Sequence, residues 1–297
     1  MKDKLTAICT KGKILANEPM KNHITFKTGG PADYFAMPAT FNELKRLLSV
    51  AKEENLKVTV IGKGSNLLVL DKGIRGLVIC TTELKDVSVD GQEITASCGL
   101  SLAALAGVAR EHGLTGLEFA SGIPGTVGGG IVMNAGAYGG ALSDCAIETI
   151  CVDMDGNLKT FRGEEQQLGY RKSAFSNGDL IVLQVKFDLH KGISEEISNL
   201  MLELNERRRD KQPLDKPSAG STFKRPEGYF AGKLIEDANL KGYRYGGASV
   251  SEKHAGFVLN DMDGTASDVL EVVKHCQKTV LEKFGVLLEP EVKIIGE

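Results

Sequence analysis

Glycine is concentrated in one part of this chain to a degree that few folds require. The sequence contains 35 glycines, and ten of them lie between Gly113 and Gly140. The stretch has no G-X-Y period, which excludes a collagen-like helix. An ordinary turn needs one or two glycines. Because glycine has no Cβ, a run of this kind lets the main chain lie directly against a flat or charged ligand. We therefore expect a binding loop here.

An earlier segment, VIGKGSNLLVL, carries a second glycine loop that begins at Gly62. It is similar to the dinucleotide fingerprint G-x-G-x-x-G, but Leu67 stands where the third glycine belongs and strand-forming residues follow instead of a helix. This excludes the Rossmann interpretation, and the absence of G-K-[ST] excludes a P-loop. Two interpretations remain open, a tight hairpin turn and an anion-binding nest of backbone N–H groups.

Taken with the second loop, ASGIPGTVGGGIVMNAGAYGG, the nest becomes the better interpretation. Two glycine loops suit a large dinucleotide whose pyrophosphate lies against backbone amides and whose ring system lies against glycines. The predicted cofactor-binding residues are Gly62, Lys63, Gly64, Ser65, Asn66, Leu67, Gly122, Ile123, Pro124, Gly125, Thr126, Gly128, Gly129, Asn134, Ala135 and Gly136.

Composition narrows the class of protein. A chain of 297 residues is too long for one ordinary core and predicts two or three domains. Its net charge of −3 argues against a nucleic-acid partner. No apolar run approaches the roughly 20 residues of a membrane span, and the polar N-terminus is unlike a secretory signal. We predict a cytoplasmic protein without membrane insertion, and no protein partner can be inferred.

The six cysteines, at positions 9, 80, 98, 145, 151 and 276, show no C-x-x-C spacing and no accompanying histidine cluster. Small buried side chains in a reducing compartment explain them best. We therefore predict neither a metal site nor a disulfide framework.

Helical and strand patterns alternate irregularly, which predicts an α+β protein rather than repeated βαβ units. A domain boundary is expected near residue 204, inside or just after the third helix. Helices are expected over residues 40–55, 101–113, 194–210 and 265–285. Thr40 with Glu43, and Thr265 with Asp268, show the spacing of a capping box, and Gly113 and Gly285 are the expected stops. Strands are expected over 57–62, 66–71, 76–80, 180–189 and 286–296, and hairpins over 88–98 and 151–163.

Six short motifs occur together in this chain: IGKGSNLLV, GIPGTVGG, NAGAYG, GYRKSAF, AGSTFKRP and LEPEVKIIG. In this order they resemble the UDP-N-acetylenolpyruvoylglucosamine reductase (MurB) family of bacterial peptidoglycan synthesis, from about Phe26 to the C-terminus. The chain length resembles the shorter subclass, which lacks a tyrosine loop.

The resemblance implies an FAD-binding fold of the vanillyl-alcohol-oxidase (PCMH) type. Its two subdomains would cover residues 1–80 and 81–203, with a C-terminal α+β substrate-binding domain over 204–297. It further implies non-covalent FAD and NADPH as co-substrate. The implied reaction converts UDP-N-acetylglucosamine enolpyruvate to UDP-N-acetylmuramate.

The resemblance also implies three catalytic residues. Arg171 matches the family's arginine, and a guanidinium can hold a carboxylate through two parallel hydrogen bonds. Ser221 matches the proton donor, although without the resemblance an ordinary turn serine is the better interpretation. Glu291 matches the catalytic glutamate, and Glu289 is the competing carboxylate in the same motif.

Tyr170, Lys211 and Arg225 are candidates for binding the substrate diphosphate, with a solvated surface role equally open. His254 is expected to be a structural, hydrogen-bonding histidine. Two further hypotheses remain: another flavin oxidase or dehydrogenase of the same fold, and a non-catalytic nucleotide-sugar or flavin-binding module. Neither needs Arg171, Ser221 and Glu291 together.

Overall fold

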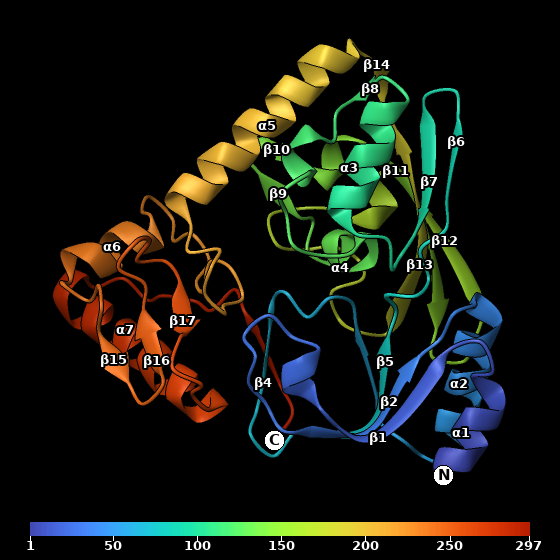
Figure 1. Cartoon of the computed structure of the whole chain (residues 1–297), viewed down its shortest axis with the longest axis horizontal. Coiled ribbons are helices and arrows are strands. Elements are labelled where there is room, and N and C mark those ends of the chain that lie inside the picture. The colour runs from blue at the N-terminus through green and yellow to red at the C-terminus, as the bar shows by residue number, and fades with distance from the viewer. The chain divides into compact units, whose positions relative to one another are not determined.

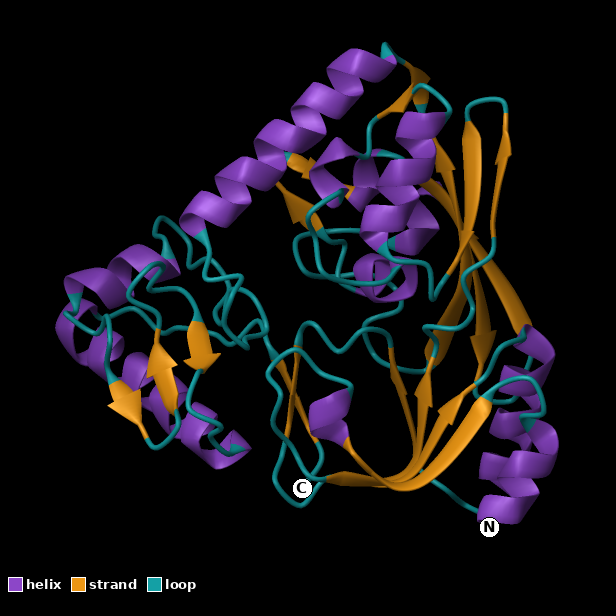
Figure 2. Ribbon diagram, viewed as in Figure 1, coloured by secondary structure: helices purple, strands orange, loops and turns teal.

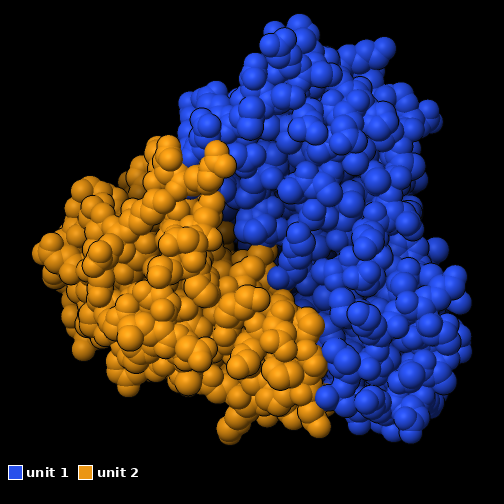
Figure 3. Space-filling model, viewed as in Figure 1, with its two compact units in different colours: residues 1–16, 34–63, 76–208 blue, residues 17–33, 64–75, 209–297 orange.

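The structure is a computed structural model that describes every residue from Met1 to Glu297. The chain forms two compact units (Figure 3): unit 1 comprises residues 1–16, 34–63 and 76–208, and unit 2 comprises residues 17–33, 64–75 and 209–297. Both units mix helices and strands, as the α+β class requires (Figure 2). These units are defined by packing. The predicted division into residues 1–80, 81–203 and 204–297 is instead defined by which ligand each part would bind, FAD or the substrate. It stays a prediction.

Unit 1 is built around a five-stranded antiparallel sheet in the order β12-β11-β13-β7-β6 (Figure 1). Its strands are β6 (Val87–Asp90), β7 (Glu93–Ser97), β11 (Ala146–Asp153), β12 (Leu158–Arg162) and β13 (Leu180–Asp188). Asp90 pairs with Glu93 across a turn in which Gly91 has a φ of +61°. The two hairpins predicted from the sequence are therefore confirmed.

Two helices that contact each other lie beside this sheet, and the shorter of them packs directly on β13 and β7. The first, α3 (Leu102–Glu111), begins at Ser101, whose Oγ accepts the Ala104 N–H at 3.1 Å, and is followed by Gly113 at a φ of +64°. The second, α4 (Val127–Val132), was not predicted, because its sequence VGGGIV contains three glycines. Val127 and Ile131 of α4 are completely buried, so tertiary packing stabilises a helix that propensity alone would not.

A second sheet has the order β1-β2-β5-β3. Its strands are β1 (Lys13–Pro19), β2 (Pro31–Met37), β3 (Val58–Ile61) and β5 (Ile74–Cys80), and β3 runs parallel to β5. The helices α1 (Lys2–Ile8) and α2 (Phe41–Glu53) contact each other beside it. Leu44, Leu47, Leu48 and Ala51 of α2 are buried, as the predicted helical periodicity requires.

Glu43, in the first turn of α2, differs from the prediction. Thr40 caps the helix by accepting the Glu43 N–H at 3.2 Å, but the Glu43 carboxylate does not complete the predicted capping box. It accepts the backbone N–H groups of Lys11 at 2.6 Å and Ala39 at 2.9 Å instead. Burial alone would raise the pKa of Glu43, but these backbone hydrogen bonds outweigh it and lower the pKa. An internal carboxylate thus fixes the turn between α1 and β1.

Replacing Glu43 with glutamine should lower the free energy of unfolding by about 1–3 kcal/mol, because buried N–H groups lose a charged acceptor. A carboxylate whose folded pKa is lowered stabilises the fold at pH values above its unfolded pKa. That stabilisation disappears as the pH falls through the folded pKa. The E43Q variant should therefore lose part of the wild type's acid-dependent destabilisation in urea titrations. Glu53→Gln, at an exposed ion pair on the same helix, is the matched control and should change little.

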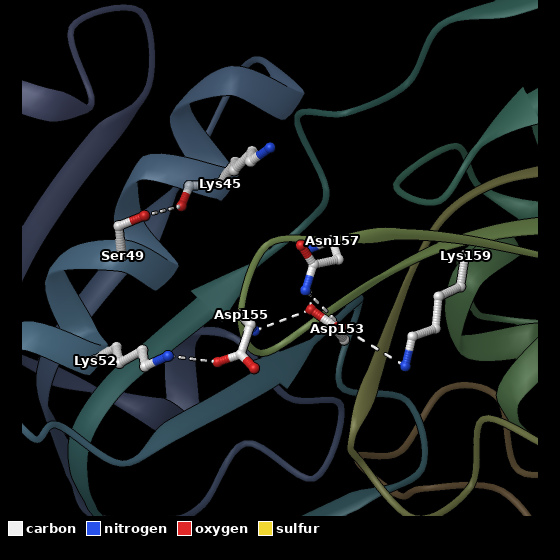
Figure 4. Close-up of polar contacts among 7 residues, drawn as sticks. All are labelled: Lys45, Ser49, Lys52, Asp153, Asp155, Asn157 and Lys159. Atoms are coloured by element: carbon white, nitrogen blue, oxygen red, sulfur yellow. Dashed lines mark hydrogen bonds and ion pairs between the residues drawn. The ribbon is translucent and has the colours of Figure 1, made fainter.

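The turn between β11 and β12 rests on α2 within unit 1 (Figure 4). Asp153 closes this turn by accepting the N–H groups of Asp155 at 3.0 Å and Asn157 at 2.9 Å. Lys52 Nζ lies 2.7 Å from Asp155 Oδ1 in an exposed ion pair, which solvent screens. A Cβ on Gly156 would lie 3.2 Å from Lys45 Cε, so the turn packs closely on the helix. These contacts join two segments more than 90 residues apart in sequence.

Unit 2 contains a three-stranded sheet, β15-β16-β17, with α7 packed along it and α6 beside α7 (Figure 1). Their bounds are α6 (Ala231–Asp237), β15 (Arg244–Tyr245), β16 (Ala248–Val250), β17 (Val258–Asn260) and α7 (Ala266–Phe284). The predicted start and end of α7 are confirmed. Thr265 and Asp268 form the capping box, and Gly285 follows at a φ of +68°.

A short parallel pair, β4 (Leu67–Val69) with β18 (Lys293–Ile295), brings the first glycine loop beside the C-terminal segment within unit 2. The strand predicted over residues 286–296 is therefore formed only at its end. Pro290, which has no N–H, pairs with Phe223 in an isolated bridge before β18 begins.

The remaining elements connect these parts. They are α5 (Ser194–Lys211), β8 (Leu114–Thr115), β9 (Gly136–Ala137), β10 (Gly140–Ala141), β14 (His190–Lys191) and the 3₁₀ turns Met20–Asn22, Glu118–Ala120, Leu142–Asp144 and Gly163–Gln166. All six cysteines are buried free thiols, as predicted. None of the helices combines the length and apolar character that crossing a membrane requires.

Candidate cofactor and active site

The first glycine loop is not a hairpin turn. Strand β3 before it pairs with β5, whereas β4 after it pairs with β18, so the loop joins strands of two different sheets. Gly64 adopts a φ of +61°, and its carbonyl accepts the Thr25 N–H at 3.3 Å. The N–H groups of Gly64 and Ser65 donate to no acceptor within the protein. This geometry favours the anion nest over the hairpin, and it leaves donors available for a ligand.

Both glycine loops meet within unit 1. An ideal Cβ built on Gly62 would lie only 2.3 Å from Thr126 Oγ1, so no side chain fits between them. Thr126 Oγ1 also accepts the Gly129 N–H at 3.3 Å and thereby starts α4. The sequence put these loops about 60 positions apart, and the fold places them in contact.

Some glycines of the second loop also meet a packing requirement of the fold. A Cβ on Gly128 would lie 2.9 Å from Cys98 Cβ, and one on Gly130 would lie 2.9 Å from Leu142 Cδ1. These two glycines let α4 pack against its neighbours. A Cβ on Gly122 would meet the Asn205 side chain at 2.3 Å, so α5 supports this part of the loop. Close packing within unit 1 is therefore a second reason for these glycines, and ligand contact at Gly122 and Gly128 stays a prediction.

Asn134, at a φ of +44°, uses its side chain to hold other loops of unit 1. Its Oδ1 accepts the Ser143 N–H at 2.9 Å, and its Nδ2 donates to Ser143 Oγ and to Gly169 O, each at 3.2 Å. Ala135 N–H bonds Gly130 O, and Gly136 pairs with Ala141. The carboxamide of Asn134 thus anchors the turn that carries Arg171.

Arg171 lies in that tight turn, where Gly169 and Lys172 form an isolated bridge. Its φ of +54° is unusual for a residue with a long side chain, and such backbone strain is often found at functional sites. The guanidinium carbon lies 5.3 Å from the centroid of the Tyr170 ring, which is largely exposed. On the far side of the turn, the buried Ser173 donates to Val132 O at 2.8 Å. The turn is thus anchored at both ends.

Ser221 and Glu291 lie on adjacent segments of unit 2. The Glu291 N–H donates to Thr222 O at 2.8 Å, and the bridge between Phe223 and Pro290 continues the pairing. Ser221 itself is exposed and follows Gly220, which has a φ of +76°. Ser221 and Glu291, 70 positions apart in sequence, therefore lie on two segments that are paired by backbone hydrogen bonds.

The two carboxylates of the C-terminal motif have different surroundings. Glu289 Oε2 lies 3.0 Å from Lys224 Nζ in an ion pair whose carboxylate side chain is 65% exposed. Glu291 is only partly exposed and lies beside the Ser221 segment. This contrast favours Glu291 over Glu289 as the functional carboxylate.

Thr222 and His254 support the Ser221 segment. Thr222 is buried; its N–H donates to Gly256 O at 2.8 Å and its Oγ1 accepts the Val258 N–H at 2.9 Å. His254 Nδ1 accepts the Gly256 N–H at 3.1 Å, so the proton of the neutral ring is on Nε2. Burial lowers the pKa of His254. The histidine is structural and hydrogen-bonded, as predicted.

The predicted substrate ligands are accessible. Arg225 is exposed and its guanidinium carbon lies 4.1 Å from the centroid of the Phe230 ring. Lys211 is exposed at the end of α5, and Tyr170 is 61% exposed in the Arg171 turn.

Sequence reasoning missed Arg208. It was not singled out among the basic residues at the end of α5, but its side chain is only 8% exposed and donates to Gly122 O in the second glycine loop. Its Nε is buried without a partner. The signal was helical spacing: Arg208 lies four residues after Leu204 and eleven after Ile197, which are the other buried residues of α5.

The loop geometry fits a bound dinucleotide cofactor. Gly62 and Thr126 leave no space for a side chain at their contact, and free backbone donors follow at Gly64 and Ser65. Thr25 Oγ1, next to the hydrogen bond between Thr25 and Gly64, is buried without a partner and supplies a further polar group. Residues 32–162 match the family model described as "FAD binding domain". The fold, the loops and this match therefore define an FAD-binding oxidoreductase.

Residues 212–295 match the family model "UDP-N-acetylenolpyruvoylglucosamine reductase, C-terminal domain". The chain is 52% identical to a UDP-N-acetylenolpyruvoylglucosamine reductase of Caldanaerobacter subterraneus, covering 99% of this chain and 98% of that protein. It is 53% identical to one of Agathobacter rectalis, covering 96% and 94%. The crystal structure of the MurB reductase of Thermus caldophilus matches with a TM-score of 0.81 at 35% identity, covering 95% and 98%. The chain belongs to the UDP-N-acetylenolpyruvoylglucosamine reductase family.

Replacing Gly62 with alanine should weaken FAD binding by about 1–3 kcal/mol, because the new methyl group overpacks the contact with Thr126 Oγ1. The dissociation constant of FAD, measured by titration into stripped protein, tests this. Gly107→Ala is the matched control, because a Cβ there meets nothing within 4 Å and the site lies within helix α3. Equal FAD affinity in the two variants would mean that the close contact between Gly62 and Thr126 is not needed to hold FAD.

Proposed function

We propose that this protein reduces UDP-N-acetylglucosamine enolpyruvate to UDP-N-acetylmuramate at the expense of NADPH. Sequence identities of 52% and 53% with named reductases, over nearly the whole length of the chain, support this reaction. The observation that carries the assignment of roles is the hydrogen bond from Glu291 N–H to Thr222 O, which keeps a hydroxyl and a carboxylate on neighbouring segments. Reduction of an enol ether needs such a pair, because a carbon atom must receive a proton.

The predicted division assigns the cofactor to residues 1–80 and 81–203 and the substrate to residues 204–297. The glycine loops of residues 62–67 and 122–136 would hold FAD without a covalent bond. Bound there, FAD would supply the hydride chemistry that links NADPH to the terminal vinyl carbon of the substrate.

Arg171 is the proposed cation. Hydride addition makes the neighbouring carbon and the attached carboxylate an enolate-like dianion. A guanidinium stays charged at every physiological pH and offers two parallel N–H donors to a carboxylate. A guanidinium held in a fixed position lowers the reaction barrier more than a mobile surface cation would, because its donors are already oriented toward the developing negative charge. The anchored turn of residues 169–173 supports this role.

Ser221 is the proposed proton donor. A hydroxyl is a weak acid, but the dianion is strongly basic, so position matters more than a matched pKa. The Oγ–H proton moves to the carbon next to the ether oxygen, a C–H bond forms, and the alkoxide is reprotonated. Gly220 at a φ of +76° leaves the backbone before Ser221 without a side chain, and this supports close approach of a ligand.

Glu291 is proposed to orient Ser221 or to return its proton. Tyr170, Lys211 and Arg225 are proposed to bind the diphosphate, for which exposed cations and a phenol hydroxyl are suited. A reaction between NADPH and a nucleotide sugar also leads us to propose a cytoplasmic location, and six reduced, buried cysteines agree with it.

The assignment is tested by product analysis. Purified protein with FAD, NADPH and UDP-N-acetylglucosamine enolpyruvate should consume one NADPH per substrate and form a product heavier by two hydrogens. Reaction in D₂O should place one non-exchangeable deuterium on the carbon next to the ether oxygen. NADPH oxidation that needs oxygen and leaves the enolpyruvyl compound unchanged would mean that the protein is an oxidase instead.

A further inference from the structure

We propose that Asn66 is a positioning residue for Glu291, and this inference rests on the function proposed above. The Asn66 Nδ2 donates to the Glu291 carbonyl oxygen at 3.1 Å, although the two residues lie 225 positions apart in sequence. The Asn66 carbonyl oxygen in turn accepts the Lys293 N–H at 2.9 Å. Asn66 is therefore hydrogen-bonded to both Glu291 and Lys293, in the segment that follows Pro290.

Both backbone polar groups of Glu291 are fixed by these contacts. Its N–H donates to Thr222 O at 2.8 Å and its carbonyl accepts from Asn66. The regular strand β18 begins only at Lys293, so the β4–β18 ladder itself does not hold Glu291. The side chain of Asn66 adds one hydrogen bond beyond the end of the ladder. Its acceptor is the carbonyl of Glu291, the proposed functional carboxylate.

The residue type suits this task. A carboxamide Nδ2 is a donor, whereas an aspartate of the same shape is an acceptor only and would repel the Glu291 carbonyl. Asn66 also belongs to the first glycine loop, between Ser65 and β4. Asn66 thus connects the loop that is proposed to hold FAD with the backbone of Glu291, whose carboxylate is proposed to take part in proton transfer. A displacement of about 1 Å in such a group can slow catalysis by roughly 100-fold.

The test compares Asn66→Ala and Asn66→Asp with Lys72→Ala, an exposed residue that follows β4 in the same segment and has no proposed role. Each FAD-loaded variant is reduced anaerobically with NADPH and then mixed with the enolpyruvyl substrate. In both Asn66 variants reoxidation by the substrate should slow by at least about 10-fold more than reduction by NADPH does. Lys72→Ala should not show this selective loss.

Hydrogen exchange supplies a second readout that does not depend on turnover. Peptides covering residues 289–295 should exchange faster in N66A and N66D than in wild type and K72A, while peptides from α7 should be unchanged. Equal slowing of both half-reactions, or unchanged exchange in residues 289–295, would overturn the positioning role. If a variant loses FAD altogether, exchange in the stripped proteins decides between the same two outcomes.

The two proposals fail in distinguishable ways. Wild-type protein that is reduced by NADPH but not reoxidised by the enolpyruvyl compound would contradict the proposed reaction. The exchange of residues 289–295 would still show whether Asn66 holds Glu291 in place.

Discussion

Ser221→Ala should bind FAD and accept electrons from NADPH like the wild type, yet fail to pass them to the enolpyruvyl substrate at a useful rate. The expected loss in the second half-reaction is about 10²- to 10⁴-fold, the usual contribution of a positioned proton donor. Ser221 is exposed and its neighbour Thr222 makes the buried hydrogen bonds of this segment, so the fold should tolerate the change. Anaerobic stopped-flow absorbance separates the two half-reactions.

Ser218→Ala is the matched control, because this serine precedes Ser221 in the same loop and has no proposed role. It should retain both half-reactions. Reoxidation of S221A at the wild-type rate would remove Ser221 from the mechanism. Loss of flavin from S221A, with S218A unaffected, would make the residue structural instead.

Arg171→Ala should slow the second half-reaction by about 10²- to 10³-fold, because charge that develops on the substrate loses a preorganised donor. Arg171→Lys keeps the charge but not the paired donors, so it should recover only part of the loss. The ratio of the reoxidation rates of R171K and R171A measures how much of the effect comes from the charge, and the loss that remains in R171K measures how much comes from the paired donors. Steady-state kcat and single-turnover reoxidation should change together.

Lys172→Ala, one position along the same turn, is the control for general damage to the loop. It should leave reoxidation near the wild-type rate. If K172A and R171A were equally impaired, the turn and not the guanidinium would be responsible. If neither variant were impaired, the proposed cation would have to be another residue.

Local structure was predictable where local signals decide it. The capping box of Thr265 and Asp268, the stop at Gly285 and the hairpin at Gly91 all follow from short-range chemistry and are confirmed. Helix α4 was missed because three of its six residues are glycine, which disfavours a helix, and it forms because Val127 and Ile131 are buried. Tertiary packing overrides propensity in such segments.

In the candidate site, too, local sequence signals identified individual residues but not the contacts that tertiary packing creates. Sequence motifs pointed to Gly62, Gly64 and Thr126, but the contact between Gly62 and Thr126 depends on how β3 and α4 pack, which no local pattern encodes. Arg208 was detectable by helical spacing and was missed because three arginines follow one another.

The two asparagines of the glycine loops illustrate the limit most clearly. Both Asn66 and Asn134 were predicted as cofactor ligands, since an asparagine in a glycine loop is a natural hydrogen-bond donor. In the fold, Asn66 bonds Glu291 O and Asn134 bonds Gly169 O, so each also anchors a segment that carries a proposed catalytic residue. Partners at such separations in sequence cannot be read from a single chain.

An anaerobic two-step spectrum tests the central claim most directly. FAD-loaded protein is first titrated with NADPH until the visible flavin absorbance disappears, and UDP-N-acetylglucosamine enolpyruvate is then added without oxygen. The account predicts full recovery of the flavin spectrum, with one equivalent of UDP-N-acetylmuramate formed. Bleaching that persists until oxygen is admitted would contradict it and would indicate a flavoenzyme with another electron acceptor.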